Sequence, residues 1–293
     1  MQTVAPTTID ALDTPLREKH ARLAAALREM GDVLIGFSGG VDSTLLAHVA
    51  YDTLGDRALA VTGLSPSLMA EEANECPRIA AHIGIPYREL RTDEMEDPNY
   101  TSNPTNRCYF CKSELWGKLV PLAAELGYTH VVDGTNADDL GDFRPGMAAG
   151  AEQGVQSPLA DAGLTKADIR ALSAAFGLPT WDKPSHPCLS SRIPHGTFIT
   201  IEKLDQVGQA EAYLRVLGFR GFRVRHHGEI ARLELPAADL PRALEQRDAI
   251  VDALTDIGFR FVALDLAGFR SGSMNGAASG VASGARTTHE AHE

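Results

Sequence analysis

The sequence has few cysteines, few tryptophans and no long hydrophobic run, and these shortages exclude several classes of protein. No apolar stretch approaches the roughly 20 residues that span a bilayer, so we expect a soluble protein without a membrane partner. Residues 1–10 lack a basic segment followed by an apolar core, so no secretory signal is predicted and the expected location is the cytoplasm. Four cysteines among 293 residues do not make a disulfide-built scaffold, and they indicate reduced thiols, metal ligands or catalysis.

Basic residues are also scarce. Lysine and arginine together number 27 against 39 aspartates and glutamates, which gives a formal net charge of −12. Proteins whose main partner is a nucleic acid usually present a basic face, so this balance argues against such a partner without excluding a local basic patch. The hydrophobic fraction of 44% and the chain length are those of a globular protein with one large or two ordinary domains.

The order of the predicted elements indicates an α/β domain followed by a smaller α+β domain. Strands and helices alternate in the first part, which is typical of a doubly wound parallel sheet. After about Arg192, two stretches with period-two alternation flank Gly228 and Glu229 and predict a hairpin between helical segments. We predict an N-terminal extension at 1–14 and the α/β domain at 15–185. The α+β domain follows at 186–270, and a disordered tail at 271–293.

One motif stands between the first predicted strand, 32–37, and the helix that follows it. It reads Ser38, Gly39, Gly40, Val41, Asp42 and Ser43. The adjacent glycines allow a tight turn and a close approach to a ligand, and the helix N-terminus offers unpaired N–H groups with partial positive charge. The pattern predicts a cradle for nucleotide phosphate. It is not the lysine-bearing P-loop, because no Gly-Lys-[Ser/Thr] follows.

A second group of polar residues follows the short predicted strand 131–132. Ligands of open α/β sheets bind beyond the carboxyl ends of the strands, and clustered aspartates beside a phosphate site suit Mg²⁺. Asp138 and Asp142 are therefore candidate magnesium ligands. An ordinary solvated turn explains the same aspartates.

Cys108 and Cys111 form a CxxC that we expect just before a helix at 113–126, and Cys188 lies far along the chain. Four interpretations remain open. They are a redox disulfide, part of a zinc site, buried structural thiols, or three ligands of an iron–sulfur cluster with one iron open. Cys188 also has the cationic neighbours Lys183 and Arg192, which favour a reactive thiolate that can attack an activated acyl group.

Arg223 and Arg225 lie two apart on a predicted strand and hence on one face. Paired guanidinium groups suit a phosphate, whereas a charged edge strand that resists aggregation is the alternative.

The Ser38–Ser43 motif resembles the PP-loop of the ATP pyrophosphatase superfamily, whose enzymes cleave ATP to AMP and pyrophosphate while adenylating a substrate. Together with four further segments, it resembles the LarE family of ATP-dependent sacrificial sulfur transferases over about residues 15–268. Those segments are 134–146, 157–159, 183–192 and 222–228.

This resemblance implies a small-molecule nucleotide substrate, pyridinium-3,5-biscarboxylic acid mononucleotide, the precursor of the nickel-pincer cofactor of lactate racemase. It implies that ATP adenylates a carboxylate and that Cys188 attacks to give a thioester, whose Cβ–S bond then breaks to leave a thiocarboxylate and dehydroalanine. Five residues match positions that the family places near the substrate or its phosphate: Ser191, Arg192, Glu211, Arg223 and Arg225.

Cys108 and Cys111 depart from the single-cysteine pattern and resemble the three-cysteine subgroup, in which three thiolates hold a [4Fe-4S] cluster and no cysteine is consumed. The resemblance also implies a homo-oligomer, a hexamer in the described case. A tRNA thiolase, an amide-forming PP-loop ligase and a non-enzymatic nucleotide-binding or metal-binding module are the alternatives.

Overall fold

A computed structural model describes residues 12–141, 145–185 and 187–270. The chain divides between Gly208 and Gln209 into two compact units, and each unit is described by itself. Of the predicted N-terminal extension, only residues 12–14 belong to the described part. The predicted tail, 271–293, lies wholly outside it.

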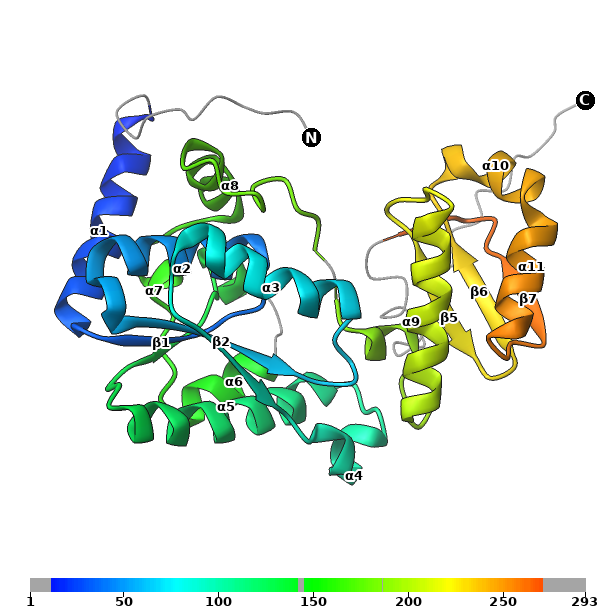
Figure 1. Ribbon diagram of the computed structural model, residues 1–293, viewed down its shortest axis with the longest axis horizontal. Helices are drawn as coiled ribbons and strands as arrows, with labels where there is room; N and C mark the ends of the chain where they lie inside the picture. The colour runs from blue at the N-terminus through cyan, green and yellow to red at the C-terminus, as the bar shows by residue number, and fades with distance from the viewer. Residues whose placement is uncertain (1–11, 142–144, 186, 271–293) are drawn as a thin grey trace, which may run out of the picture. The chain divides into compact units, whose positions relative to one another are not determined.

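The first unit is a four-stranded parallel sheet in the order β3-β2-β1-β4, with helices on both faces (Figure 1). Its strands are β1 (Val33–Gly36), β2 (Ala58–Leu64), β3 (Tyr87–Arg91) and β4 (Val131–Val132). Its helices are α1 (Thr14–Met30), α2 (Val41–Leu54), α3 (Ala70–Ile83), α4 (Pro98–Thr101), α5 (Arg107–Leu126), α6 (Pro145–Glu152), α7 (Pro158–Asp161) and α8 (Lys166–Ala175). The predicted doubly wound α/β class is confirmed.

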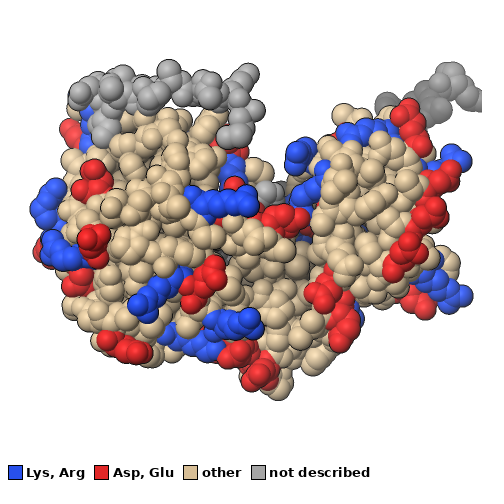
Figure 2. Space-filling view, in the orientation of Figure 1, with Lys and Arg blue, Asp and Glu red and all other residues tan. Residues whose placement is uncertain are grey.

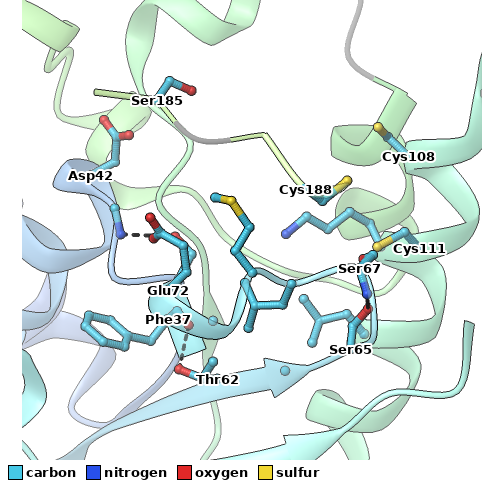
Figure 3. A pocket seen from close by; sticks show the side chains of 18 of the residues that line it. Phe37, Asp42, Thr62, Ser65, Ser67, Glu72, Cys108, Cys111, Ser185 and Cys188 are labelled. Atoms are coloured by element: carbon cyan, nitrogen blue, oxygen red, sulfur yellow. Dashed lines mark hydrogen bonds between the residues drawn. The ribbon is translucent and has the colours of Figure 1, made fainter. Parts of the chain in front are cut away.

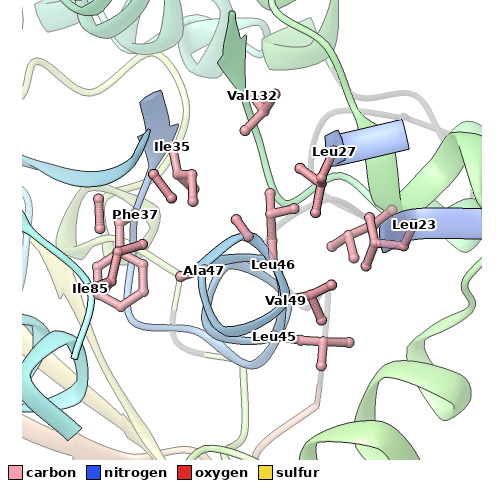
Figure 4. Packing of buried hydrophobic residues seen from close by; sticks show 14 of the residues in the cluster. Leu23, Leu27, Ile35, Phe37, Leu45, Leu46, Ala47, Val49, Ile85 and Val132 are labelled. Carbon is pink, nitrogen blue, oxygen red and sulfur yellow. The ribbon is translucent and has the colours of Figure 1, made fainter. Parts of the chain in front are cut away.

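Strands β1, β2 and β4 are largely buried, which explains their nearly continuous apolar sequences, whereas the edge strand β3 is polar and has no fully buried residue. In β1, Ile35 packs on the side of α1 and α2, whereas the adjacent Leu34 packs against Trp116 of α5. Figure 4 shows Leu46 of α2 in the cluster with Leu27 of α1 and Ile35. Each fully buried leucine or isoleucine contributes about 2 kcal/mol by leaving water.

The direction of winding reverses between β1 and β4. From β1 the chain proceeds through β2 to β3 on one side, and β4 then pairs with the opposite side of β1, with Ile35 beside Val132. Such a switch point is where loops after two adjacent strands diverge and leave room for a ligand. The motif Ser38–Ser43 spans the loop after β1 and the first residues of α2, so the fold places it at the switch point.

Two local predictions were wrong. Residues 93–106, predicted as a loop, contain the 3-10 turn η3 (Glu94–Glu96) and the short helix α4, whose first turn is capped by the Asp97 carboxylate accepting from Asn99 N at 2.8 Å. Helix α5 begins at Arg107 rather than near Ser113. The two cysteines of the CxxC therefore lie within the helix, and their spacing of three places them on one helix face.

The second unit is a three-stranded sheet in the order β5-β6-β7, packed against helices. The predicted hairpin is confirmed as β5 (Arg223–His227) and β6 (Ile230–Glu234), which pair antiparallel, and β7 (Phe261–Leu264) adds parallel to β6. Helix α9 (Ile201–Val216) contributes Leu214 to this core, and α10 (Leu240–Glu245) and α11 (Arg247–Asp256) complete it.

Candidate active site

The Ser38–Ser43 loop is already ordered for an anion. Gly39 has φ +63°, and Gly40 caps α2 without a side-chain hydrogen bond, so the first N–H groups of the helix are open to a ligand. The hydroxyls of Ser38 and Ser43 lie 3.1 Å apart, and the Ser43 hydroxyl donates to the carbonyl of Gly40 at 3.3 Å. These contacts hold the turn in shape without occupying the helix N-terminus.

The loop after β4 packs directly against this turn. A Cβ atom at Gly134 would lie 3.0 Å from the backbone nitrogen of Ser43, so a larger residue would push the two loops apart by a few tenths of an ångström. Asn136 Nδ2 donates to the Asp42 carboxylate at 3.3 Å, and Lys166, the first residue of α8, forms an ion pair with the same carboxylate. The two loops of the switch point are thus linked through Asp42.

A cavity of about 630 Å³ opens beside the Ser38–Ser43 loop, within the first unit. This volume suits a nucleotide-sized ligand. Its wall includes Ser38, Gly40 and Asp42 at one end and Cys108, Cys111 and Cys188 at the other. Figure 3 shows the three cysteines on one side of the view and Asp42 and Glu72 on the other.

None of the three cavity cysteines is in a disulfide. Cys108 is exposed, whereas Cys111 and Cys188 are partly buried. Burial raises the pKa of Cys111 to about 12, and the negative charges of Cys188 and Glu94 add to the shift. Negative charge on one sulfur therefore opposes negative charge on the next, and a cationic centre shared by the thiols would relieve that repulsion.

Lys183 joins the phosphate loop to α3. Its ammonium group donates to the Gly39 carbonyl at 3.1 Å and forms ion pairs with Glu72 at 2.7 Å and Glu75 at 2.6 Å. Burial opposes the charge of Lys183, but the hydrogen bonds from Glu72 and Glu75 raise its pKa above the ordinary value. The lysine stays charged, and it lies five residues before Cys188.

Cys188 is followed by the 3-10 turn η5 (Leu189–Arg192), which carries two of the predicted substrate residues. The Ser191 hydroxyl donates to the Cys188 carbonyl at 2.8 Å, and the buried Arg192 guanidinium donates to the same carbonyl at 3.1 Å. Both side chains therefore support the backbone of Cys188, and neither is among the residues that line the cavity. Their proposed contact with substrate stays a prediction.

The predicted magnesium ligands have different placements. Asp138 is exposed and accepts a hydrogen bond from the backbone nitrogen of Lys166 at 2.8 Å, so it supports the start of α8, and it does not line the cavity. Asp142 lies outside the described residues. Within residues 12–141, 145–185 and 187–270, no three His, Cys, Asp or Glu side chains form a group that could hold a metal ion.

Glu211, Arg223 and Arg225 lie in the second unit, and all three are buried. Glu211 accepts from the backbone nitrogen of Val224 at 3.1 Å, whereas Arg225 donates two hydrogen bonds to Glu234 at 3.0 and 2.8 Å. Arg223 lies over a phenylalanine ring with its guanidinium carbon 5.1 Å from the ring centre. These contacts fix the side chains within their own unit, and a substrate role for them stays a prediction.

The sequence did not predict four buried polar residues, of which Glu94, Tyr100 and Arg107 line the cavity. Glu94, Tyr100, Asn103 and Arg107 are each at most 5% exposed, and three of them lie in the stretch interpreted as a loop. Glu94 accepts from Ser65, and its other oxygen has no hydrogen-bond partner among the described residues. Residues 93–106 are rich in Asp, Asn and Pro. These residue types are common in loops, but they also begin helices, and this second meaning could have predicted the short helix.

The surface of the first unit carries charges of both signs. On the face seen in Figure 2, acidic and basic side chains are interspersed, without a continuous basic surface. No helix in the described part of the chain is long and apolar enough to cross a membrane.

No protein-family model matches the chain. Comparison with individual known proteins does find relatives. Over 262 residues, the chain is 49% identical to an uncharacterised protein of Synechocystis sp., covering 89% of this chain and 98% of that protein. It is 40% identical over 261 residues to the pyridinium-3,5-bisthiocarboxylic acid mononucleotide synthase of Lactiplantibacillus plantarum, covering 89% and 95%. It is 23% identical over 236 residues to the tRNA-specific 2-thiouridylase MnmA of Rickettsia felis, covering 68% and 64%.

Proposed function

The chain belongs to the LarE family of ATP-dependent sulfur transferases, and we propose that it adenylates a carboxylate of pyridinium-3,5-biscarboxylic acid mononucleotide and converts it to a thiocarboxylate. The observation that carries this proposal is the cavity of about 630 Å³ in which a phosphate loop and three free thiols face the same space. Activation at one end and sulfur delivery at the other are the two halves of this reaction. The product serves nickel-pincer cofactor synthesis.

In the activation step, the open N–H groups at the start of α2 and the hydroxyls of Ser38 and Ser43 bind the phosphates of ATP. The substrate carboxylate attacks the α-phosphorus, a P–O bond forms, and pyrophosphate leaves. Lys183 and Lys166 hold the loop in place through their contacts with Gly39 and Asp42, while carboxylates pair with both ammonium groups. The charge that stabilises the leaving pyrophosphate comes from the N-terminus of α2.

Mg²⁺ accompanies ATP in this proposal. The Asp42 carboxylate lines the cavity at the phosphate end, which suits a cation that keeps phosphate oxygens and water as its other ligands. Asp138 and Asp142 remain the sequence-based candidates for the same role.

For the sulfur step we favour the three-cysteine route. Cys108, Cys111 and Cys188 would hold a [4Fe-4S] cluster, whose chemistry when bound is to supply sulfide at its open iron. The donor set fits, because all three thiols are free and line one cavity. Each thiolate of such a cluster binds a different iron, so the sulfurs need not converge on one point, as they do not here. The sacrificial route from Cys188 alone is the competing hypothesis.

The test separates the two half-reactions. Substrate-dependent ATP–pyrophosphate exchange measures adenylation, and mass spectrometry of the nucleotide measures thiocarboxylate formation. Cys188→Ala should abolish thiocarboxylate formation and leave exchange intact, whereas the control Cys76→Ala, at a buried cysteine outside the cavity lining, should retain both. Thiocarboxylate formed by Cys188→Ala would refute both sulfur routes.

Cys108→Ala and Cys111→Ala decide between the routes. Loss of thiolation in both supports the cluster, and a full single turnover in both supports sacrifice of Cys188. Iron and acid-labile sulfide, measured on protein purified without oxygen, give an independent readout.

A tRNA thiolase is the second candidate function, because MnmA is a distant relative. The net charge of −12 disfavours it, and a tRNA gel shift at moderate salt tests it directly. We further propose, from family membership, a cytoplasmic homo-oligomer, which light scattering after size-exclusion chromatography would test.

A further inference from the structure

Asn103 has an unusual conformation for a buried residue. It is fully buried, and its φ of +57° makes it the one non-glycine residue with positive φ in the described part of the chain. A residue with a Cβ atom is strained in this region, although asparagine tolerates it better than most. Something in the surroundings must offset that strain.

The side chain of Asn103 shows what offsets it. Its amide nitrogen donates to the carbonyls of Ile193, Pro194 and Thr197 at 3.2, 2.8 and 3.1 Å. These carbonyls lie just after η5, the turn that follows Cys188. The backbone adds a further tie, since Gly196 N donates to Asn103 O at 2.9 Å.

Arg107 extends this contact to the CxxC helix. It is buried, it is the first residue of α5, and it immediately precedes Cys108. Its guanidinium donates to Asn103 Oδ1 at 2.6 Å and to the Ser190 carbonyl at 3.1 Å. One side chain thus joins the start of the helix that carries two thiols to a residue two positions after the third thiol.

A third contact joins α4 to the segment after Cys188 and completes the network of buried hydrogen bonds. The hydroxyls of Tyr100 and Ser190 lie 2.6 Å apart, and both residues are buried. The segment after Cys188 is therefore held from 100–107 by side chains that water does not reach. In a buried setting, losing such a hydrogen bond leaves the partner group unsatisfied, so the network is expensive to break.

We propose that Asn103 and Arg107 are positioning residues that hold the CxxC helix and the Cys188 segment together, so that their thiols can serve one thiol-bound centre. The contacts described above support the role of Asn103 and Arg107 in spacing the thiols. That the thiols bind a metal centre rests on the proposed function. The ligand chemistry is that of a thiophilic metal centre, such as iron with sulfide.

The first experiment measures the spacing without any metal. The full-length protein is treated with a short bis-alkylating thiol reagent, and peptide mass spectrometry quantifies bridges between Cys188 and Cys108 or Cys111. The wild type should form the bridge, and Asn103→Ala and Arg107→Met should form it at least about tenfold more slowly. The matched control is Asn99→Ala on α4, four residues before Asn103, whose side chain is exposed and bonded to Asp97, and it should react like the wild type.

Folding is checked in each variant by urea unfolding followed by tryptophan fluorescence, because Arg107 itself lines the cavity and ATP–pyrophosphate exchange is therefore not independent of the network. Where Asn103→Ala does not fold, Asn103→Gly removes the amide while relieving the positive φ. Arg107→Lys keeps the charge, but its side chain ends one atom short of the Nη1 that donates to both acceptors, and it should bridge at an intermediate rate. Equal bridging in all variants, or no bridge in the wild type, would overturn the proposal.

The second experiment uses ferrous iron and sulfide as the probe, added without oxygen. The wild type and Asn99→Ala should take up iron and acid-labile sulfide with a cluster absorption spectrum, and the Asn103 and Arg107 variants should hold several-fold less. Retention of wild-type cluster content in those variants would contradict the positioning role. A wild type that bridges its thiols but binds no cluster would refute the proposed cofactor and leave the positioning role standing.

Discussion

Gly39→Ala perturbs the phosphate loop at its most constrained point. Gly39 has φ +63°, and an added Cβ would lie 3.0 Å from the sulfur of Cys76 and 3.4 Å from a methyl carbon of Ile79. The left-handed conformation costs alanine about 1–2 kcal/mol, and reduced freedom of the unfolded chain returns about 0.4–1 kcal/mol. Pushing a carbon against the buried sulfur adds about 1–3 kcal/mol. We expect a net loss of about 3 kcal/mol in the free energy of unfolding.

Gly127→Ala is the control that separates strain from crowding. Gly127 has φ +81° at the end of α5, and an added Cβ would meet nothing within 4 Å. It should therefore cost only the backbone share, about 1 kcal/mol. Urea unfolding followed by tryptophan fluorescence measures both, because the two tryptophans, Trp116 and Trp181, belong to the first unit.

A double mutant tests the named contact. In a Cys76→Ala background the sulfur is gone, so Gly39→Ala should cost about 1–2 kcal/mol less than in the wild type. Two results would refute the reasoning: a Gly39→Ala cost no greater than that of Gly127→Ala, or strictly additive costs of Gly39→Ala and Cys76→Ala. Substrate-dependent pyrophosphate exchange should fall with Gly39→Ala and not with Gly127→Ala, since only the former alters the loop that binds phosphate.

Three further predictions concern charge. Burial lowers the pKa of His48 below its ordinary value of 6.5, so the unfolded chain binds the proton more tightly. Stability is then complete above about pH 6.5 and falls as the pH is lowered through that value, and His48→Gln should flatten this slope in urea titrations between pH 7 and 5. Lys183→Met should lower stability by about 2 kcal/mol and reduce exchange, with the loss smaller when Glu72→Gln is combined with it; equal losses would contradict the ion pair. Glu234→Gln should destabilise the second unit by about 3 kcal/mol, because the buried Arg225 loses its paired charge, and hydrogen exchange over 223–234 should quicken while tryptophan fluorescence stays unchanged.

Much of the fold was predictable because its signals are local. The strand over 58–64 was predicted to the residue, and the capping box at Thr165 and Asp168 marks the start of α8 within the chain itself. The turn at Ser38–Ser43 was equally predictable, since its glycines and hydroxyls are neighbours in the sequence; its binding of phosphate stays a prediction. The short helices within 93–106 were missed because Asp and Pro mark both turns and helix starts.

Sequence alone determined the two motifs from which the chemistry is predicted: a glycine-rich and hydroxyl-rich turn at Ser38–Ser43, predicted to be a phosphate cradle, and three thiols outside it. The covalent order of residues carries this information, because each motif is complete within a few positions. Only the tertiary structure decided that Cys108, Cys111 and Cys188 line the same cavity as the cradle. Asn103 and Arg107, to which we assign that placement, make buried contacts with residues about 90 positions away, which no local pattern encodes.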